Sequence, residues 1–168
     1  MKRLFIIGGS SSLAFLVLGL ILVRAMGFEP RERSPGLWLS GEVVTTRVTD
    51  WSFTDQVEHV YVETRTWYSI PHSVTTYCTT YNGELYLTST YPQAAEFPGN
   101  RSWNHNVVRD PHVRLKIGAR VYERKIFLVT DPAEKTAVLD SKAKKYPDLR
   151  RAEEDRVHVL RTESVTRP

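Results

Sequence analysis

Hydrophobic and polar residues alternate with a period of two along much of the chain after residue 40, which is typical of strands with one buried face. In residues 59–66, for example, Val60 and Val62 would lie on one side of a strand and Tyr61 and Glu63 on the other. Valine, threonine and tyrosine are frequent in these runs and favour a pleated surface. The pattern predicts six or seven strands, over residues 40–49, 59–66, 71–81, 84–90, 112–117 and 120–130, with 157–165 as the last.

Two tight hairpins are predicted within this series. Asn82-Gly83 separates the runs 71–81 and 84–90, and this pair suits a type I′ turn, in which both central residues need a positive φ. Gly118-Ala119 separates the next two strands in the same way. Most of the predicted strands are therefore expected to pair with their neighbours in an antiparallel manner.

One longer helix is predicted after the second hairpin. Asp131 is a good N-cap, Pro132 stands at the first helical position, and Glu134 completes a capping box. Pro147 ends the helix. The shorter segments predicted are a turn or short helix at 50–56 and one helical turn at 104–109, which Asp110-Pro111 stops.

Six or seven strands with one well-capped helix after a hairpin predict a mainly β (α+β) domain, built as a small antiparallel barrel with one or two appended helices. An eight-stranded lipocalin-like barrel is disfavoured, because the capped helix comes too early and the strands are too few.

The start of the chain predicts a single transmembrane helix. Residues 4–23 contain no charge, and twenty helical residues span roughly 30 Å, the thickness of a bilayer core. An uncleaved anchor over residues 1–25 is favoured over a cleaved signal peptide, since Val23-Arg24-Ala25 is a poor cleavage site, and over a buried soluble helix. Residues 26–36 then form a tether and 37–168 the barrel domain. A short amino-terminal tail usually stays in the cytoplasm, which places the domain outside it.

Composition excludes several classes of function. The 41% hydrophobic and 25% charged content is that of a globular protein, and the net charge of +4 is spread without a basic stripe, which argues against nucleic-acid binding. One cysteine allows no intrachain disulfide. The five histidines lack the paired spacing of metal ligands, so no metal site is expected.

Several short motifs follow one another in residues 71–113. They are Pro71-His72-Ser73-Val74, Thr88-Ser89-Thr90, Arg101, and Trp103-x-x-Asn106-x-x-x-x-Pro111-x-Val113. In this order they resemble the pyridoxamine-phosphate-oxidase-like split β-barrel superfamily, which includes flavin proteins and deazaflavin (F420)-dependent nitroreductases. The resemblance covers about half of the predicted domain.

The resemblance implies a split barrel that binds FMN or F420, pairs as a homodimer, and acts as an oxidoreductase that transfers hydride to a small-molecule substrate. It implies no catalytic acid or base. The cofactor-binding residues that it implies are His72, Ser73, Thr75, Thr88, Ser89, Thr90, Arg101, Trp103 and Asn106.

Each of these residues also has a structural interpretation. Thr88-Ser89-Thr90 can simply end a strand, Trp103 can pack into the core, and Asn106 can bridge backbone groups. The basic residue that usually grasps the cofactor from the first hairpin strand is absent, with Ser73 and Thr75 in its place. A second hypothesis therefore stays open: a non-catalytic, membrane-tethered barrel that has lost cofactor binding and serves as a binding or structural module.

Overall fold

The computed structural model describes residues 13–22, 24, 26–32, 34–149 and 154–165. Within these ranges, eight strands form one sheet, accompanied by two α-helices after residue 100 and two 3₁₀ turns. The strands are β1 Glu42–Val44, β2 Val60–Arg65, β3 Pro71–Thr76, β4 Cys78–Tyr81, β5 Glu84–Thr90, β6 His112–Ile117, β7 Arg120–Leu128 and β8 Val157–Ser164. The helical elements are η1 Ser52–Gln56, α2 Ser102–Arg109, α3 Pro132–Lys145 and η2 Glu154–Arg156.

The sheet closes into a barrel because one extended segment, residues 71–81, provides the strands at both ends of the sheet. The strand order is β3-β2-β6-β7-β8-β5-β4, so β3 and β4 lie at opposite ends although Tyr77 alone separates them in the chain. Around this residue the Thr76 hydroxyl donates to the carbonyl of Thr88 (2.7 Å), and the Thr88 amide donates to the carbonyl of Tyr77 (3.3 Å). The predicted mainly β barrel is confirmed, and the predicted strand 71–81 divides at Tyr77, where it changes partner.

The predicted Asn82-Gly83 turn and the Asp131 N-cap are confirmed, but the predicted capping box is not completed. In the part of the chain that the structure describes, the Glu134 carboxylate accepts from Tyr86 and Arg161 and not from the Asp131 amide. Asn82 and Gly83 both have positive φ (52° and 77°), as a type I′ turn requires. The carboxylate of Asp131 accepts hydrogen bonds from the amides of Ala133 and Glu134, both at 3.2 Å, and so caps α3. The Glu134 carboxylate accepts from the Tyr86 hydroxyl at 2.8 Å, which ties α3 to β5.

The first predicted strand is shorter than expected. Within residues 40–49, only β1 pairs with another strand. It runs parallel to β7, whereas the other strand pairs of the sheet are antiparallel. β1 enters the ladder beside the β6–β7 turn, where the Glu42 amide donates to the carbonyl of Ala119 (3.1 Å). Beyond Val44 the chain leaves β7 and crosses toward Trp51, which is buried in the core.

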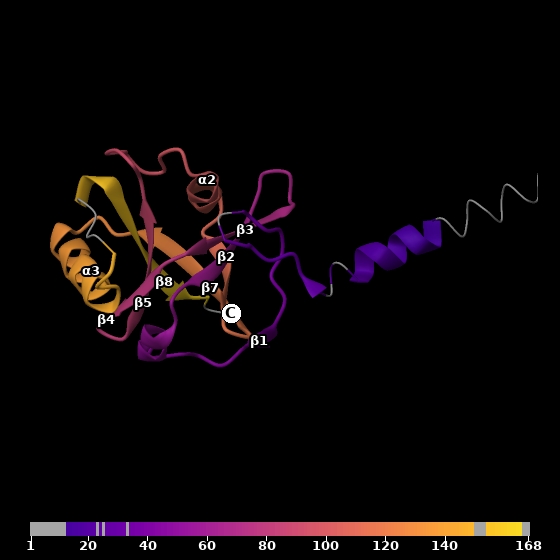
Figure 1. Ribbon diagram of the computed structural model, residues 1–168, viewed down its shortest axis with the longest axis horizontal. Coiled ribbons are helices and arrows are strands. Elements are labelled where there is room, and N and C mark those ends of the chain that lie inside the picture. The colour runs from indigo at the N-terminus through magenta and orange to yellow at the C-terminus, as the bar shows by residue number, and fades with distance from the viewer. Residues whose placement is uncertain (1–12, 23, 25, 33, 150–153, 166–168) are drawn as a thin grey trace, which may run out of the picture.

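The core fills the barrel and extends under α3. Figure 1 shows α3 beside β4 and β5 on one side of the barrel and α2 over another edge. One cluster of apolar side chains occupies the interior, and it includes Trp51, Leu85, Leu115 and Trp103. A second cluster packs Val138 and Leu139 of α3 against the outer face of β5 and β8.

Residues 13–22 are helical, and this helix extends away from the barrel (Figure 1). In the described part of the chain, no helix combines the length and the apolar character needed to span a bilayer. Most of the first half of the predicted anchor, residues 4–12, lies outside the described residues. The segment predicted as a tether contacts the barrel, since Gly36 and Ser73 exchange backbone hydrogen bonds of 2.9 and 3.0 Å.

Candidate functional site

A cavity of about 630 Å³ lies between β3, β5 and the start of α2. Its volume is within the range of pockets that hold small molecules and cofactors. The lining residues are Glu32, Ser34, Pro35, His72, Val74, Thr75, Thr76, Tyr77, Thr88, Ser89, Thr90, Arg101, Ser102 and Trp103.

Seven of the nine predicted site residues line this cavity, although they come from three elements. They are His72, Thr75, Thr88, Ser89, Thr90, Arg101 and Trp103. The chain brings them together because β3 and β5 meet at the point where the barrel closes, and α2 follows β5 after one loop. Ser73 and Asn106 do not line the cavity.

The end of β5 provides a row of hydroxyls. Thr88 and Ser89 are buried, and Thr90 is exposed at the end of the strand. Arg101 lies beside this end, where its guanidinium donates to the carbonyl of Thr90 (3.0 Å) and rests over the ring of Tyr91. Within the residues described, this is the one hydrogen bond of the Arg101 guanidinium, so most of its donors remain available for an anion.

Strand β3 provides His72 and Thr75 to the cavity wall. The Nδ1 atom of His72 and the hydroxyls of Ser73 and Thr75 are buried without a hydrogen-bond partner among the described residues. Burial lowers the pKa of His72 below its ordinary value, which favours the neutral ring. These three atoms are covered by protein, so they do not themselves face the cavity.

The remaining predicted residues have identifiable structural contacts. Ser73 is covered by the segment around Gly36. The side-chain amide of Asn106 faces β2 and donates to the Thr64 hydroxyl at 3.0 Å, so this contact is with a side chain and not with the backbone groups that the structural interpretation predicted. Trp103 packs into the barrel core and also lines the cavity, and its contact with a cofactor ring stays a prediction.

Lys142 was not expected at the site from the sequence. Its ammonium donates to the hydroxyl of Thr88 (2.8 Å) and lies 5.4 Å from the centre of the Tyr77 ring. Burial lowers the pKa of Lys142 to about 8. Its spacing in the sequence could have indicated this burial. Lys142 follows the buried Val138 and Leu139 by four and three residues, so it lies on the same face of α3.

Asn104 is a second residue that the motifs did not indicate. It is fully buried, and its side-chain nitrogen lies 2.6 Å from the Tyr91 hydroxyl, 3.1 Å from the Pro98 carbonyl and 3.3 Å from the Ser89 hydroxyl. These contacts hold the loop after β5 against the end of the strand. Asn104 therefore positions Ser89 without lining the cavity itself.

The cavity combines hydroxyl donors, the cation of Arg101 and aromatic rings, and a second cation, Lys142, lies outside its lining. Arg101 stands at one end of the hydroxyl row, and Lys142 lies behind Thr88. Tyr77 and Trp103 provide rings, and Glu32 adds a carboxylate on the side of the cavity formed by the amino-terminal segment. Across the described parts of the chain, no cluster of His, Cys, Asp and Glu could hold a metal ion. The arrangement suits a planar ring that carries an anionic group.

Comparison with solved structures identifies the fold. A candidate 5-nitroimidazole antibiotic resistance protein from Bacteroides thetaiotaomicron superposes with a TM-score of 0.52 at 16% identity, over 79% of this chain and 89% of that one. A conserved hypothetical protein from Mycobacterium tuberculosis gives 0.53 at 15% identity, over 72% and 86%. The heme storage protein HutZ from Vibrio cholerae gives 0.50 at 8% identity, over 68% and 86%.

No protein-family profile matches the sequence, and no curated protein matches it. The identities to the solved structures are low, so the likeness concerns the fold. The chain shares its fold, a split β-barrel, with these structures, and this is the fold that its motifs predict.

Proposed function

We propose that this split barrel binds FMN or F420 in the cavity between β3, β5 and α2, which we therefore call the cofactor cavity, and that it acts as an oxidoreductase on a small molecule. The observation that carries the proposal is the convergence of seven predicted residues from β3, β5 and α2 on one cavity of suitable size. The Arg101 guanidinium supports it, because it lies at the end of the hydroxyl row and most of its donors are available for an anion.

The residues divide into two groups by chemistry. Thr88, Ser89, Thr90 and Arg101 would hold the phosphate, since hydroxyls give directional donors and a guanidinium compensates its charge. Lys142 adds positive charge behind Thr88, and so provides from α3 the cation that the first hairpin strand lacks.

The aromatic and β3 side chains would hold the ring. Trp103 and Tyr77 offer apolar surfaces, and His72 and Thr75 line the same cavity. The bound cofactor would supply hydride transfer, which needs no nucleophile from the protein. The chain's own contribution is to bind and orient the cofactor and its substrate.

A titration tests the proposal directly. We expect the purified full chain to bind FMN or F420 with quenching of tryptophan fluorescence, because Trp103 lines the cavity. Arg101→Ala should weaken binding about tenfold or more, the typical effect of losing a hydrogen bond to a charged group. Arg120→Ala, which removes an exposed arginine of β7, is the matched control and should bind as the unaltered chain does.

Two results would contradict the proposal. One is the absence of both a bound chromophore and fluorescence quenching with either cofactor. This would favour the non-catalytic module instead. The other is equal affinity in the Arg101→Ala and Arg120→Ala variants, which would remove Arg101 from the phosphate role.

We also propose that residues 4–23 anchor the protein in a membrane, with the barrel on the extracytoplasmic side. Two features support an anchor. Leu13 and Phe15 of the helix are 63% and 75% exposed, and the turn between β2 and β3 exposes Trp67 (79%) and Tyr68. This turn lies on the side of the barrel from which the helix leaves (Figure 1), and such aromatic residues are enriched at membrane interfaces.

Fractionation with protease protection tests this topology. We expect the chain in the membrane fraction, with the barrel cleaved only by protease that reaches the extracytoplasmic side. Recovery of the full chain in the soluble fraction would contradict the anchor. The homodimer that the resemblance implies is a further part of the proposal, and sedimentation equilibrium of the purified chain would show it as twice the monomer mass.

A further inference from the structure

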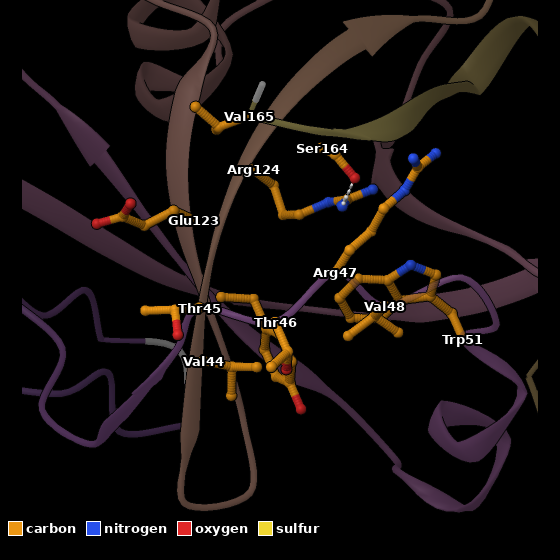
Figure 2. A pocket seen from close by; sticks show the side chains of 11 residues that line it. Val44, Thr45, Thr46, Arg47, Val48, Trp51, Glu123, Arg124, Ser164 and Val165 are labelled. Carbon is orange, nitrogen blue, oxygen red and sulfur yellow. Dashed lines mark hydrogen bonds between the residues drawn. The ribbon is translucent and has the colours of Figure 1, made fainter. Parts of the chain in front are cut away.

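A second cavity, of about 360 Å³, lies on the barrel where segment 44–51 crosses β7 and the end of β8. Figure 2 shows this region, which we call the Arg124 cavity. Its lining residues are Val44, Thr45, Thr46, Arg47, Val48, Trp51, Tyr122, Glu123, Arg124, Ser164 and Val165. It shares no residue with the cofactor cavity, so it is a separate candidate site.

Arg124 is held in this cavity by fixed contacts on one side. The side chain is only 6% exposed, and its guanidinium lies 4.9 Å from the centre of the Trp51 ring. It donates to the Ser164 hydroxyl (2.7 Å) and to the Thr162 carbonyl (3.2 Å), both on the neighbouring strand β8. These contacts orient the guanidinium from the side of β8 and use only part of its five donors.

The charge of Arg124 lacks a direct ion-pair partner. Among the residues that the structure describes, its guanidinium forms no ion pair, and its Nε atom is buried without a hydrogen-bond acceptor. Glu84 and Glu163 act on it only at longer range, and the Glu163 carboxylate accepts from Arg161. Burial lowers the pKa of Arg124, yet a guanidinium stays protonated in proteins, so the cavity contains a buried cation that carboxylates compensate only from a distance.

A second cation and two hydroxyls lie around the same opening. Figure 2 shows the Arg47 side chain extending beside the Arg124 guanidinium, whereas Glu123 extends to the other side of its strand. Thr45 and Thr46 line the cavity from the crossing segment. The polar part of the cavity therefore offers donors and positive charge, which an oxyanion requires.

The other walls are apolar. Val44, Val48 and Val165 line the cavity together with the rings of Trp51 and Tyr122. An inorganic ion would leave these surfaces in contact with water, whereas a carboxylate with an apolar body would cover them. We propose that the Arg124 cavity binds a small organic carboxylate, with the carboxylate between Arg124 and Arg47 and the apolar body against Trp51.

Benzoate is a suitable probe, because it joins one carboxylate to a flat apolar ring. We expect calorimetric titration of the full chain with sodium benzoate to show one saturable site. Arg124→Met should weaken this binding about tenfold or more, and Arg47→Met should weaken it less, because Arg47 is exposed and its contact is more strongly screened by water. The matched control, Arg120→Met, removes an exposed arginine of the same strand outside the cavity and should leave binding unchanged.

Arg47→Met keeps the test informative if Arg124→Met does not fold, because residue 47 lies on an exposed segment. The proposal is overturned if benzoate shows no saturable binding, or if Arg47→Met and Arg120→Met bind it equally well. It is also overturned if inorganic phosphate binds and benzoate does not, since the apolar wall would then have no role. Loss of binding in both cavity variants but not in the control supports it.

Discussion

Replacing Trp103 by alanine should lower the free energy of unfolding by about 3–5 kcal/mol, the usual cost of removing a buried aromatic side chain from a packed core. Trp103 is 6% exposed and belongs to the cluster that fills the barrel. Trp103 and Val107 are the two residues of the short helix α2 that belong to this core cluster. The loss should therefore include a cavity and a loosened α2, and urea unfolding followed by circular dichroism measures it.

Val108→Ala is the matched control on the same helix. Val108 is 61% exposed, so its truncation should change the free energy of unfolding by no more than about 0.5 kcal/mol. If Trp103→Ala cost as little as Val108→Ala, Trp103 would not be a core residue, and its role would be limited to covering a ligand. A large loss would confirm that Trp103 packs in the barrel core, and its proposed contact with a cofactor ring is tested separately by the fluorescence titration.

Strands, turns and caps could be predicted from the sequence because their causes are local. Asn82-Gly83 adopts positive φ without help from the rest of the chain, and Asp131 reaches amides two and three residues ahead of it. The motif order in residues 71–113 added a long-range prediction that local rules could not give. It placed residues of β3, β5 and α2 around a common site, and most of them line one cavity.

Other features depend on contacts that no local pattern specifies. The partner change at Tyr77 occurs where the barrel closes, because the Thr88 amide donates to the Tyr77 carbonyl and the Thr76 hydroxyl donates to the Thr88 carbonyl. Strand β1 is short because only Glu42–Val44 of segment 40–49 pairs with β7. Arg124 looks like an ordinary polar position in an alternating strand, and only the crossing of Trp51 over it shows that its charge is buried.

Lys142→Met should stabilise the protein at pH 7 by about 1–3 kcal/mol, because it removes the cost of burying an ammonium group. Burial lowers the pKa of Lys142 to about 8 in the folded chain, from 10.5 for an exposed lysine. The unfolded chain thus binds more protons between these pH values, and the stability of the unaltered protein rises as the pH increases through this window. The cost is present in full below pH 8 and disappears by about pH 10.5.

The advantage of Lys142→Met should accordingly shrink between pH 8 and pH 10.5, and urea unfolding at a series of pH values would show it. Lys144→Met is the control: Lys144 lies on an exposed position of the same helix, so its effect should stay within about 0.5 kcal/mol throughout. A stabilisation that did not vary with pH would refute the burial of a charged ammonium. Lys142→Met could gain stability and yet lose affinity for FMN or F420. The free-energy cost of burying the ammonium group would then be explained by cofactor binding, because an anionic phosphate near Thr88 would give Lys142 a partner of opposite charge.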